Sequence, residues 1–333
     1  MKLVRYARVG ASPDAGRAGI LVEGDLVGDL RAAYAAYLIE RQGDPQGREI
    51  AVLRFPANWA QHLAIGAVGR DALAAASDWL SGAERDASGP DGEPLFVPLS
   101  EVRLDAPAVP KKIIAVGRNY LAHLNEAGTS LPMSIPSSWI KATSSLIGPF
   151  DDVVKPTVVG ELDYETELTL VIGERCRDVP EDRAYDVIAG YTVLNDISAR
   201  DVVRRERAEG NQMLGKMFDG FAPSGPWIVT RDEIADPMDL AIRTRINGET
   251  RQDSRTARMI WSIPKLVAFL SQMTLEPGDL ITTGTPEGVA MGHKGESSWF
   301  LQDGDVIESE VEGVGVMRNR VVQEPAKKGG WQW

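Results

Sequence analysis

The sequence predicts an α+β fold, in which a β-rich roll or barrel with peripheral helices follows a smaller α+β unit. Three observations support this prediction. The chain has 333 residues, 43% of them hydrophobic, which is enough for one large core or two modest ones. From about Pro107 onward, short apolar runs alternate with turn residues, as is typical of strands. Helical patterns interrupt these runs only at about 120–127, 199–209 and 259–272, so alternating βαβ units are not expected.

The first hundred residues predict a small α+β unit. "AGILVEGDLVGDL" has the pattern of a hairpin around Gly24-Asp25, and the helix-like segments "LRAAYAAYLIERQG" and "ALAAASDWLSGA" follow it. The stretch 84–94 is rich in Gly, Pro and Asp, which predicts an exposed loop or linker. We therefore expect an N-terminal domain over 1–107, a catalytic domain over 108–323 and a tail over 324–333 outside the core.

Several strands and one further hairpin are predicted in the β-rich part. The apolar runs "KIIAVG", "LTLVIG", "VIAGYTVLND" and "GPWIVT" each have the length and composition of a strand. In "LAIRTRINGETRQ", two alternating runs flank Asn247-Gly248, a pair that readily adopts the positive φ angles of a type I′ turn. The connectivity of these strands does not follow from the pattern alone.

Charge and cysteine content narrow the possible partners. The 36 basic and 48 acidic residues give a net charge of −12, which argues against nucleic acids and anionic membranes as partners and favours small molecules. The single cysteine, Cys176, excludes an intrachain disulfide framework and a thiolate metal cluster formed by this chain alone. "MKLVRYARVG" lacks the apolar core of a signal peptide, and no window is apolar for long enough to span a bilayer. We expect a cytoplasmic protein.

Two glutamates in "GELDYETELTLVIG" indicate a cation site. Read with a period of two, Glu165 and Glu167 lie on one face of a strand, roughly 7 Å apart at the backbone. Such like charges resist burial unless a cation or water lies between them, and Mg²⁺ or Mn²⁺ prefers carboxylate oxygens. Asp196 ends the next apolar run, where it could be a third ligand or the N-cap of the helix that follows. The alternative for the pair is a solvated polar face.

The chain has only three histidines. We expect His62 to be structural because its context "NWAQHLAIG" is apolar and helix-like, and we expect His293, in the Gly-rich "EGVAMGHKGE", to be solvated. His123 precedes Glu126 by three residues, so on a short helix both side chains share a face, and the carboxylate can orient the imidazole. This dyad can activate a water molecule, and the alternative is a surface ion pair.

Six separated blocks together resemble the fumarylacetoacetate hydrolase superfamily in order and spacing. They are "VGRNYLAHLNE", "WIKATSSLIGP", "LDYETELTLVIG", "GYTVLNDISARD", "GKMFDGFAPSGPWIV" and "MIWSIPKLVAFLSQMTLEPGDLITTGTPEGV". The resemblance covers about residues 108–323, roughly two-thirds of the chain. The preceding region resembles the variable N-terminal extension of many bacterial members.

The resemblance implies a mixed β-roll catalytic domain, a homodimer, and one Mg²⁺ or Mn²⁺ per subunit. The implied metal ligands are Glu165, Glu167 and Asp196. The implied catalytic residues are His123, Glu126, Lys216 and Arg200. The residues expected to contact the substrate are Arg118, Tyr120, Lys141 and Thr285, and the substrate is expected to be a small keto acid.

The implied reaction is hydrolysis of a carbon–carbon bond in an acylpyruvate or diketo acid of aromatic or sugar-acid catabolism. The metal ion would act as a Lewis acid on the substrate. His123, oriented by Glu126, would deprotonate the attacking water, and Lys216 would stabilise the oxyanion with Arg200 nearby. A keto acid such as pyruvate and a carboxylic acid would result.

The chain departs from the family pattern around the oxyanion site. Hydrolases of the family commonly have a glutamine seven residues after the metal-binding aspartate, where this chain has Val203. Met217 and Gly220 stand where Ser and Thr are frequent. Isomerisation or tautomerisation and decarboxylation of keto or hydroxydienoic diacids therefore remain open as alternatives to hydrolysis. A non-catalytic keto-acid-binding protein is a further alternative, against which the intact set of acidic residues and His123 argues.

Overall fold

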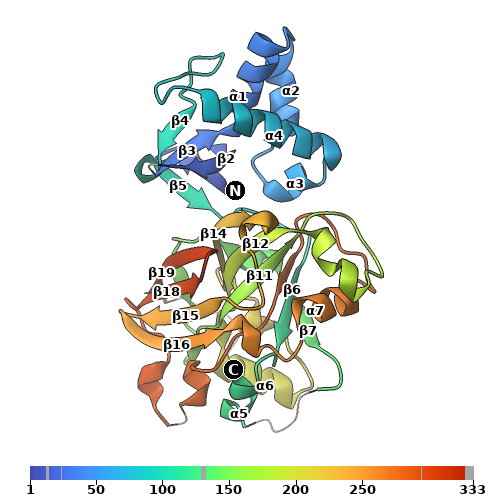
Figure 1. Ribbon diagram of the computed structural model, residues 1–333. Coiled ribbons are helices and arrows are strands. Elements are labelled where there is room, and N and C mark those ends of the chain that lie inside the picture. Colours follow the sequence, from blue (N-terminus) through green and yellow to red (C-terminus); the bar gives the residue numbers. More distant parts are fainter. Residues whose placement is uncertain (13–14, 24, 129–132, 294, 327–333) are drawn as a thin grey trace.

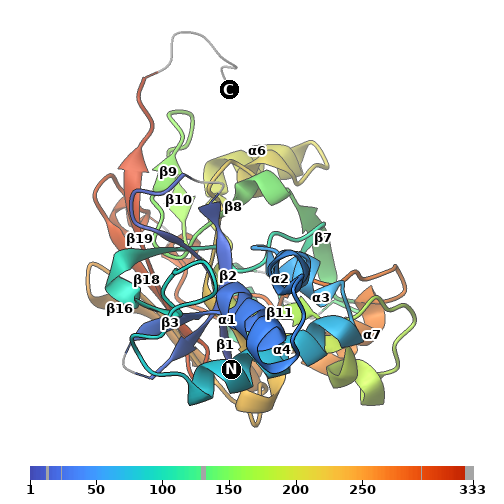
Figure 2. The ribbon, with the colours of Figure 1, turned by 90° about the horizontal axis from the view of Figure 1, so that it is seen from above.

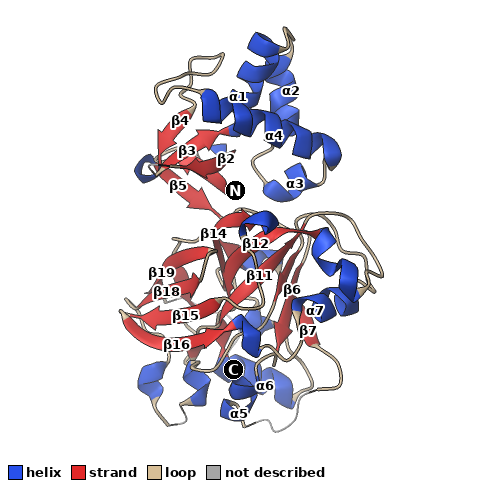
Figure 3. Cartoon of the chain, viewed as in Figure 1, coloured by secondary structure: helices blue, strands red, loops and turns tan. Residues whose placement is uncertain are grey.

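The computed structural model describes residues 1–12, 15–23, 25–128, 133–293 and 295–326. The predicted α+β fold is confirmed: strands form two large sheets, and the helices lie around them (Figures 1 and 3). Most helices of the N-terminal part lie above the β-rich part in Figure 1.

The larger sheet has twelve strands and runs through both parts of the chain. Its path is β4-β3-β2-β1-β14-β12-β11-β17-β6-β7, with β5 paired to β1 and β8 to β14. The strands are β1 (Lys2–Arg8), β2 (Arg17–Val22), β3 (Leu26–Asp29), β4 (Phe96–Pro98), β5 (Val102–Asp105), β6 (Ile113–Gly117), β7 (Ser137–Lys141), β8 (Leu146–Ile147), β11 (Thr166–Ile172), β12 (Ile188–Asn195), β14 (Ala222–Thr230) and β17 (Leu280–Thr282).

The second large sheet has five strands in the order β16-β15-β18-β19-β9. These strands are β9 (Val153–Lys155), β15 (Ala241–Ile246), β16 (Glu249–Arg255), β18 (Val306–Val311) and β19 (Gly315–Gln323). The predicted hairpin is confirmed, since β15 pairs with β16 and both Asn247 and Gly248 have positive φ, 53° and 84°. A separate two-stranded ladder joins β10 (Leu162–Asp163) to β13 (Ser198–Ala199).

The N-terminal part has the predicted α+β composition. Its helices are α1 (Leu30–Ala36), α2 (Gly47–Arg54), α3 (Trp59–Leu63) and α4 (Ala67–Gly82). The β2–β3 hairpin forms where it was predicted, although Gly24 itself lies outside the described residues. The helix predicted over 30–43 begins as α1 and continues as a π-helical stretch over Tyr37–Arg41. Asp29 caps α1 by accepting a hydrogen bond from the backbone N–H of Ala32.

Backbone pairing links the N-terminal part to the rest of the sheet. β1 pairs with β14, with Lys2 opposite Val229 and Leu3 opposite Ile228. The N-terminal strands therefore extend the sheet of the β-rich part. The boundary at residue 107 stays a prediction. Of the predicted tail, residues 327–333 lie outside the described residues.

The three helices predicted for the β-rich part are confirmed with shorter bounds. They are α5 (Leu121–Glu126), α6 (Arg200–Ala208) and α7 (Ile263–Leu270). Figures 1 and 2 show α7 at one side of the molecule, away from α6. Among the described residues, none of the helices combines the length and the apolar character that crossing a membrane requires.

Strand β11 is buried along its whole length. On one face, Leu168 and Leu170 belong to a hydrophobic core that also contains residues of α7. On the other face, Val171 belongs to a second core with Leu30 and Trp59 of the N-terminal part. The solvated polar face considered for this strand is therefore wrong, because apolar layers cover both sides of the sheet here.

Candidate metal centre and active site

Antiparallel pairing of β11 and β12 brings the acidic residues together. Thr166, the first residue of β11, lies opposite Asn195, the last residue of β12, so Glu165 and Asp196 flank the same end of the ladder. Two hydrogen bonds hold them there: the backbone N–H of Asp196 donates to Glu165 O (2.8 Å), and that of Glu165 donates to Asn195 Oδ1 (2.8 Å). The alternative role of Asp196 as a helix cap is wrong, since α6 begins at Arg200 with Ala199 as its N-cap.

The three carboxylates form a compact, buried cluster. One oxygen from each of Glu165, Glu167 and Asp196 lies within 4.8 Å of the others. The residues are only 5%, 1% and 0% exposed. Three carboxylate oxygens converging on one point match the ligands that Mg²⁺ and Mn²⁺ prefer.

Three cationic side chains surround this cluster. Lys216 Nζ donates to Asp196 Oδ2 (2.8 Å) and to Glu165 Oε2, while Lys141 Nζ donates to Asp196 Oδ1 (2.8 Å). Arg200 uses Nη2 to donate to Glu165 Oε1 (2.5 Å). Lys216 also lies over the ring of Trp139, 5.5 Å from its centroid.

Asp163 is a buried member of the cluster that the sequence did not identify as a site residue. It accepts hydrogen bonds from Arg200 Nε (2.7 Å) and from the backbone N–H groups of Ala290 (2.8 Å) and Met291 (3.1 Å). Asp163 thereby fixes the guanidinium that contacts Glu165. Its place two residues before Glu165 on the same alternating face was the signal that could have identified it.

Glu167 differs from the other carboxylates because it makes no ion pair with a described cationic residue. It accepts a hydrogen bond from the backbone N–H of Gly284 (2.7 Å). Asp163, Glu165 and Asp196 lie beside the three cations, so Glu167 carries the excess negative charge. Such a buried excess charge is what a divalent ion would neutralise.

The pKa shifts reflect this asymmetry. Burial raises the pKa of the Glu167 carboxyl well above its usual range, and the Asp196 and Glu165 carboxylates raise it further. Burial acts in the same direction on Glu165, but Arg200 and Lys216 outweigh it and hold the pKa of Glu165 below its usual range. Without a metal ion, Glu167 therefore favours its protonated form.

The pKa values of Lys141 and Lys216 are shifted in opposite directions. Burial acts to lower the pKa of Lys216, but Asp196 and Glu165 outweigh it and raise that pKa. Burial lowers the pKa of Lys141 more than Asp196 raises it. Lys141 is completely buried behind Asp196, and its carboxylate contact still favours the charged form.

The dyad of His123 and Glu126 lies on α5, as predicted. His123 Nδ1 is 3.5 Å from Glu126 Oε2, and His123 is only 8% exposed, so the alternative of a surface ion pair is wrong. The backbone N–H of Gly288 donates to both oxygens of Glu126, at 3.1 and 3.2 Å. A Cβ at Gly292 would lie 2.2 Å or less from the Glu126 side chain, so glycine is needed for this close approach. The carboxylate is therefore held firmly against the loop that follows β17.

A cavity of about 430 Å³ joins the carboxylate cluster to the dyad. We call it the active-site cavity. The residues that line it are Gly117, Arg118, His123, Leu124, Ala127, Ser137, Trp139, Glu165, Glu167, Arg200, Arg207, Gly210, Asn211, Gln212, Lys216, Thr285 and Met291. Asp196, Glu126, Lys141 and Tyr120 are not among them. The roles proposed for Lys141 and Tyr120 in contacting substrate stay predictions.

Thr285 faces the cavity and is held by a residue that the sequence did not identify. Its hydroxyl donates to Thr166 O (3.0 Å) and accepts from Gln252 Nε2 (2.9 Å). Gln252 Nε2 also donates to Pro286 O (2.9 Å). A glutamine on β16 in the second sheet therefore positions the loop that carries Thr285.

The structure shows how the residues that depart from the family pattern, Val203 and Gly220, are accommodated. Val203 is 2% exposed and does not line the cavity, because its side chain packs against Gly215. A Cβ at Gly215 would lie 2.6 Å from Val203 Cγ2. Gly220 has φ 82°, a conformation in which a threonine would be strained.

The remaining histidines lie apart from this site. His62 is buried in the N-terminal part, where its ring stacks on Phe55 with centroids 5.1 Å apart and Nδ1 donates to Arg54 O (2.7 Å). His293 stacks on Trp299. Neither lines the active-site cavity.

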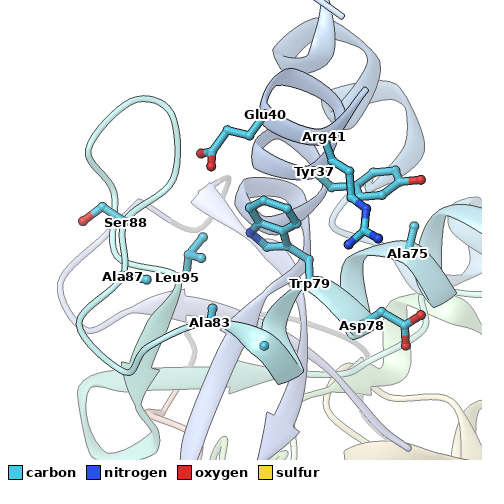
Figure 4. Close-up of a pocket in the computed structure, with 11 residues that line it drawn as sticks. Tyr37, Glu40, Arg41, Ala75, Asp78, Trp79, Ala83, Ala87, Ser88 and Leu95 are labelled. Atoms are coloured by element: carbon cyan, nitrogen blue, oxygen red, sulfur yellow. The ribbon is translucent and has the colours of Figure 1, made fainter. Parts of the chain in front are cut away.

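A second hollow, of about 670 Å³, lies in the N-terminal part (Figure 4). We call it the Trp79 groove, and it is lined by Tyr37, Glu40, Arg41, Ala75, Asp78, Trp79, Gly82, Ala83, Ala87, Ser88 and Leu95. The indole of Trp79 forms its centre, and its charged side chains, Glu40, Arg41 and Asp78, are exposed.

Comparison with known proteins identifies relatives with several activities. Residues 112–322 match the family described as "Fumarylacetoacetate (FAA) hydrolase C-terminal". Human mitochondrial oxaloacetate tautomerase FAHD2B is 42% identical over 228 residues, which is 68% of this chain and 71% of that protein. The structure of 5-carboxymethyl-2-hydroxymuconate delta-isomerase from Mycobacterium smegmatis is similar with a TM-score of 0.67 at 32% identity, covering 97% of this chain and 100% of the other.

A third relative was solved with ligands. Maleylpyruvate hydrolase from Sphingobium sp. SYK-6, in complex with manganese (II) ion and pyruvate, has a TM-score of 0.70 at 31% identity. The similarity covers 98% of this chain and 100% of that one. Tautomerase, isomerase and hydrolase are thus all represented among proteins similar to this chain.

Proposed function

The chain belongs to the fumarylacetoacetate hydrolase family, and we propose that it uses a divalent metal ion to tautomerise or isomerise a small 2-oxo acid. One observation carries this proposal: a single cavity joins a buried carboxylate cluster to the His123–Glu126 dyad, while position 203 contributes no hydrogen-bond donor to it. We also propose a homodimer, as the family resemblance implies.

The residues present fit a hard divalent ion. Glu165, Glu167 and Asp196 would hold Mg²⁺ or Mn²⁺, and the buried excess charge of Glu167 would be neutralised. When bound, the ion would supply Lewis-acid polarisation of the oxygens of the 2-oxo acid.

His123 is the group best placed to move a proton. Its Nδ1 lies on the side of Glu126, which leaves Nε2 for the substrate. Nε2 would take the proton from the carbon beside the keto group and return it to the oxygen or to a different carbon. The fixed Glu126 carboxylate would stabilise the imidazolium formed between the two transfers.

Cationic and polar groups on the cavity wall would stabilise and orient the substrate. Lys216 and Arg200 line the cavity and would offset negative charge that develops on the substrate oxygen. Thr285, held by Gln252, would donate to the substrate carboxylate once its hydroxyl turns away from Thr166 O. Lys216 and Arg200 are fixed by buried hydrogen bonds, so little reorganisation of these two groups is needed when charge develops.

Hydrolysis of an acylpyruvate, the reaction that the sequence favoured, is the second candidate. The dyad of His123 and Glu126 is suited to activating a water molecule, and this specific observation favours hydrolysis. Attack of water also needs a donor that polarises the carbonyl under attack. The side chain of Val203 cannot donate, which leaves Lys216 and Arg200 as the donors for that carbonyl, so we place this reaction second.

Product analysis with Mn²⁺-loaded protein tests the proposal. Oxaloacetate and a panel of acylpyruvates would be supplied, and the enol absorbance, pyruvate, carboxylic acid and CO₂ would be followed. We expect faster interconversion of enol and keto forms or of double-bond isomers, without bond cleavage. Pyruvate and a carboxylic acid as the main products would establish the hydrolase instead. Release of CO₂ would establish the decarboxylase, and binding without turnover would establish a keto-acid-binding protein.

A further inference from the structure

The active-site cavity is electrostatically divided. Glu165 and Glu167 lie at its inner end with the candidate metal site. Arg118, Arg207 and Gln212 also line it but come from other elements: the turn between β6 and α5, the last turn of α6, and the loop after α6. Among the described residues, neither Arg118 nor Arg207 forms an ion pair with a carboxylate. Two unpaired guanidinium groups in one cavity are a strong attraction for an anion.

Arg207 lies on the same face of α6 as Arg200 but further from the candidate metal site. Arg200 and Arg207 are seven residues apart on α6, so they lie on one face of the helix, separated by about 10 Å along its axis. Arg200 contacts Glu165 in the carboxylate cluster. Arg207 therefore lies about two turns further along α6, away from the carboxylate cluster but still on the wall of the cavity.

Arg207 is oriented by a neutral side chain. Gln212 Oε1 accepts from Arg207 Nε (3.1 Å) and Nη2 (3.0 Å), which fixes one edge of the guanidinium plane. Nη1 has no hydrogen-bond partner among the described residues. Because Gln212 carries no charge, it orients the guanidinium without neutralising it.

The backbone of Arg118 supports a functional role for this cluster. Arg118 has φ 59°, a left-handed conformation that costs on the order of 1–3 kcal/mol for a residue other than glycine and is found preferentially at functional sites. The charge of Arg118 also reaches Arg207: partial desolvation lowers the pKa of Arg207, and Arg118 lowers it further. An anion between the two guanidinium groups would relieve this repulsion.

We propose that Arg118, Arg207 and Gln212 form a second carboxylate subsite, so that the enzyme selects 2-oxo acids with a distal carboxylate over matched monoacids. This rests on the proposed function, because the first carboxylate and the keto oxygen are taken to lie at the metal end. The fork of Arg207 matches the two oxygens of a carboxylate, and charge-assisted hydrogen bonds of this kind are the stronger ones. Arg207 and Gln212 are then residues that determine specificity.

A matched pair of 2-oxo acids tests the subsite. 2-Oxoglutarate and 2-oxopentanoate share the same chain length and the same 2-oxo acid end, and they differ only in the distal carboxylate. Their dissociation constants for Mn²⁺-loaded protein would be measured by calorimetry. We expect the diacid to bind about 10-fold to 100-fold more tightly, the usual contribution of hydrogen bonds to charged groups. The R207Q variant should lose this preference while its affinity for 2-oxopentanoate is unchanged.

Two further variants make the test specific. R205Q removes an exposed arginine of the same helix that does not line the cavity, and it should retain the preference. R207K should retain only part of it, because lysine keeps the charge but lacks the fork.

The outcomes separate the two proposals. Equal binding of both ligands to the wild-type protein would overturn the subsite and leave the 2-oxo acid function intact. An equal loss of affinity for both ligands in R207Q would show that Arg207 is only structural, which also overturns the subsite. Failure of both ligands to bind would overturn the proposed function and, with it, this inference.

Discussion

The active-site cavity and the Trp79 groove are both lined by charged side chains, but only the cavity has a cluster of buried charges. In the cavity, Glu167 and Lys216 are 1% and 2% exposed, and each has fixed polar neighbours. In the groove, Glu40, Arg41 and Asp78 are exposed to solvent, although the groove is the larger hollow, at about 670 Å³ against about 430 Å³. Size alone therefore does not distinguish a reactive site from a surface depression.

The free-energy cost of burying charges explains why the cavity and the groove differ. Removing an ion from water costs several kcal/mol even after the protein relaxes, so buried charges persist where paired charges and hydrogen bonds offset that cost. The carboxylate cluster meets this condition except at Glu167, where a divalent ion would supply the missing charge. The exposed charges of the groove have no such cost and indicate no such ion.

Replacing His123 should have the largest effect on rate. We expect His123→Ala to lower kcat by about 10²–10⁴, the usual contribution of a general base. Mn²⁺ affinity, measured by calorimetry, should not change, because His123 is not one of the three clustered ligands. His293→Ala, which removes a histidine outside the cavity, is the matched control. An unimpaired His123→Ala enzyme would contradict the role of the dyad.

Neutralising Glu167 should weaken metal binding. We expect Glu167→Gln to lower Mn²⁺ affinity by about 10²-fold or more, since changes even beyond the direct ligands typically cost 10-fold to 100-fold. The variant should fold normally, because the amide is neutral like the protonated carboxyl that Glu167 favours in the metal-free protein. Glu174→Gln alters an exposed carboxylate paired with Arg70 and is the control. Unchanged Mn²⁺ affinity in Glu167→Gln would remove the physical basis of the proposed function.

Metal affinity should also depend on pH. Because the pKa of Glu167 is raised, its carboxyl stays protonated to higher pH than usual, and a metal ion must displace that proton. Affinity should therefore rise with pH up to that pKa, by at most about tenfold per pH unit for one proton. Calorimetry in buffers with different ionisation enthalpies measures the proton release directly. Glu167→Gln should show a weaker pH dependence, and an identical one would assign the proton elsewhere.

The N-terminal part should show a smaller pH effect, on stability. Burial lowers the pKa of His62 below its usual value, so the unfolded chain takes up this proton first as pH falls. The contribution of His62 to the free energy of unfolding should be fully present above about pH 6.5. Below that pH it should fall, by at most about 1.4 kcal/mol per pH unit. Urea unfolding of His62→Gln beside the wild type checks this. The difference between the two proteins should shrink as the pH is lowered, and a constant difference would contradict the prediction.

Changes in the Trp79 groove should have the smallest effect. We expect the double variant of Arg41→Ala and Asp78→Ala to change the free energy of unfolding by no more than about 0.5 kcal/mol, as is usual for surface sites. Its kcat should stay within about twofold of the wild type. A large loss of activity would mean that the groove is coupled to the active-site cavity and that the contrast drawn above fails.

The sequence predicted local features better than distant associations. The Asn247-Gly248 turn, the three helices of the β-rich part and the shared helix of His123 and Glu126 depend on residues close together in the chain, and the structure has them all. The contacts of Asp163 with Arg200, and of Gln252 with Thr285, join residues 37 and 33 positions apart, and the sequence did not identify them. Local periodicity contains no information about such pairs, because they form only when the sheets assemble.

By itself, the amino-acid sequence determined the alternation that directs Glu165 and Glu167 to one side of the chain, and the motifs that carry the family resemblance. Three further features depend on how the chain folds. The side that carries the glutamates is buried, Glu167 lacks a cationic partner among the described residues, and Arg118 and Arg207 line one cavity. The physical reason is that a period of two specifies which residues share a face, whereas the cost of burying their charges depends on what covers that face.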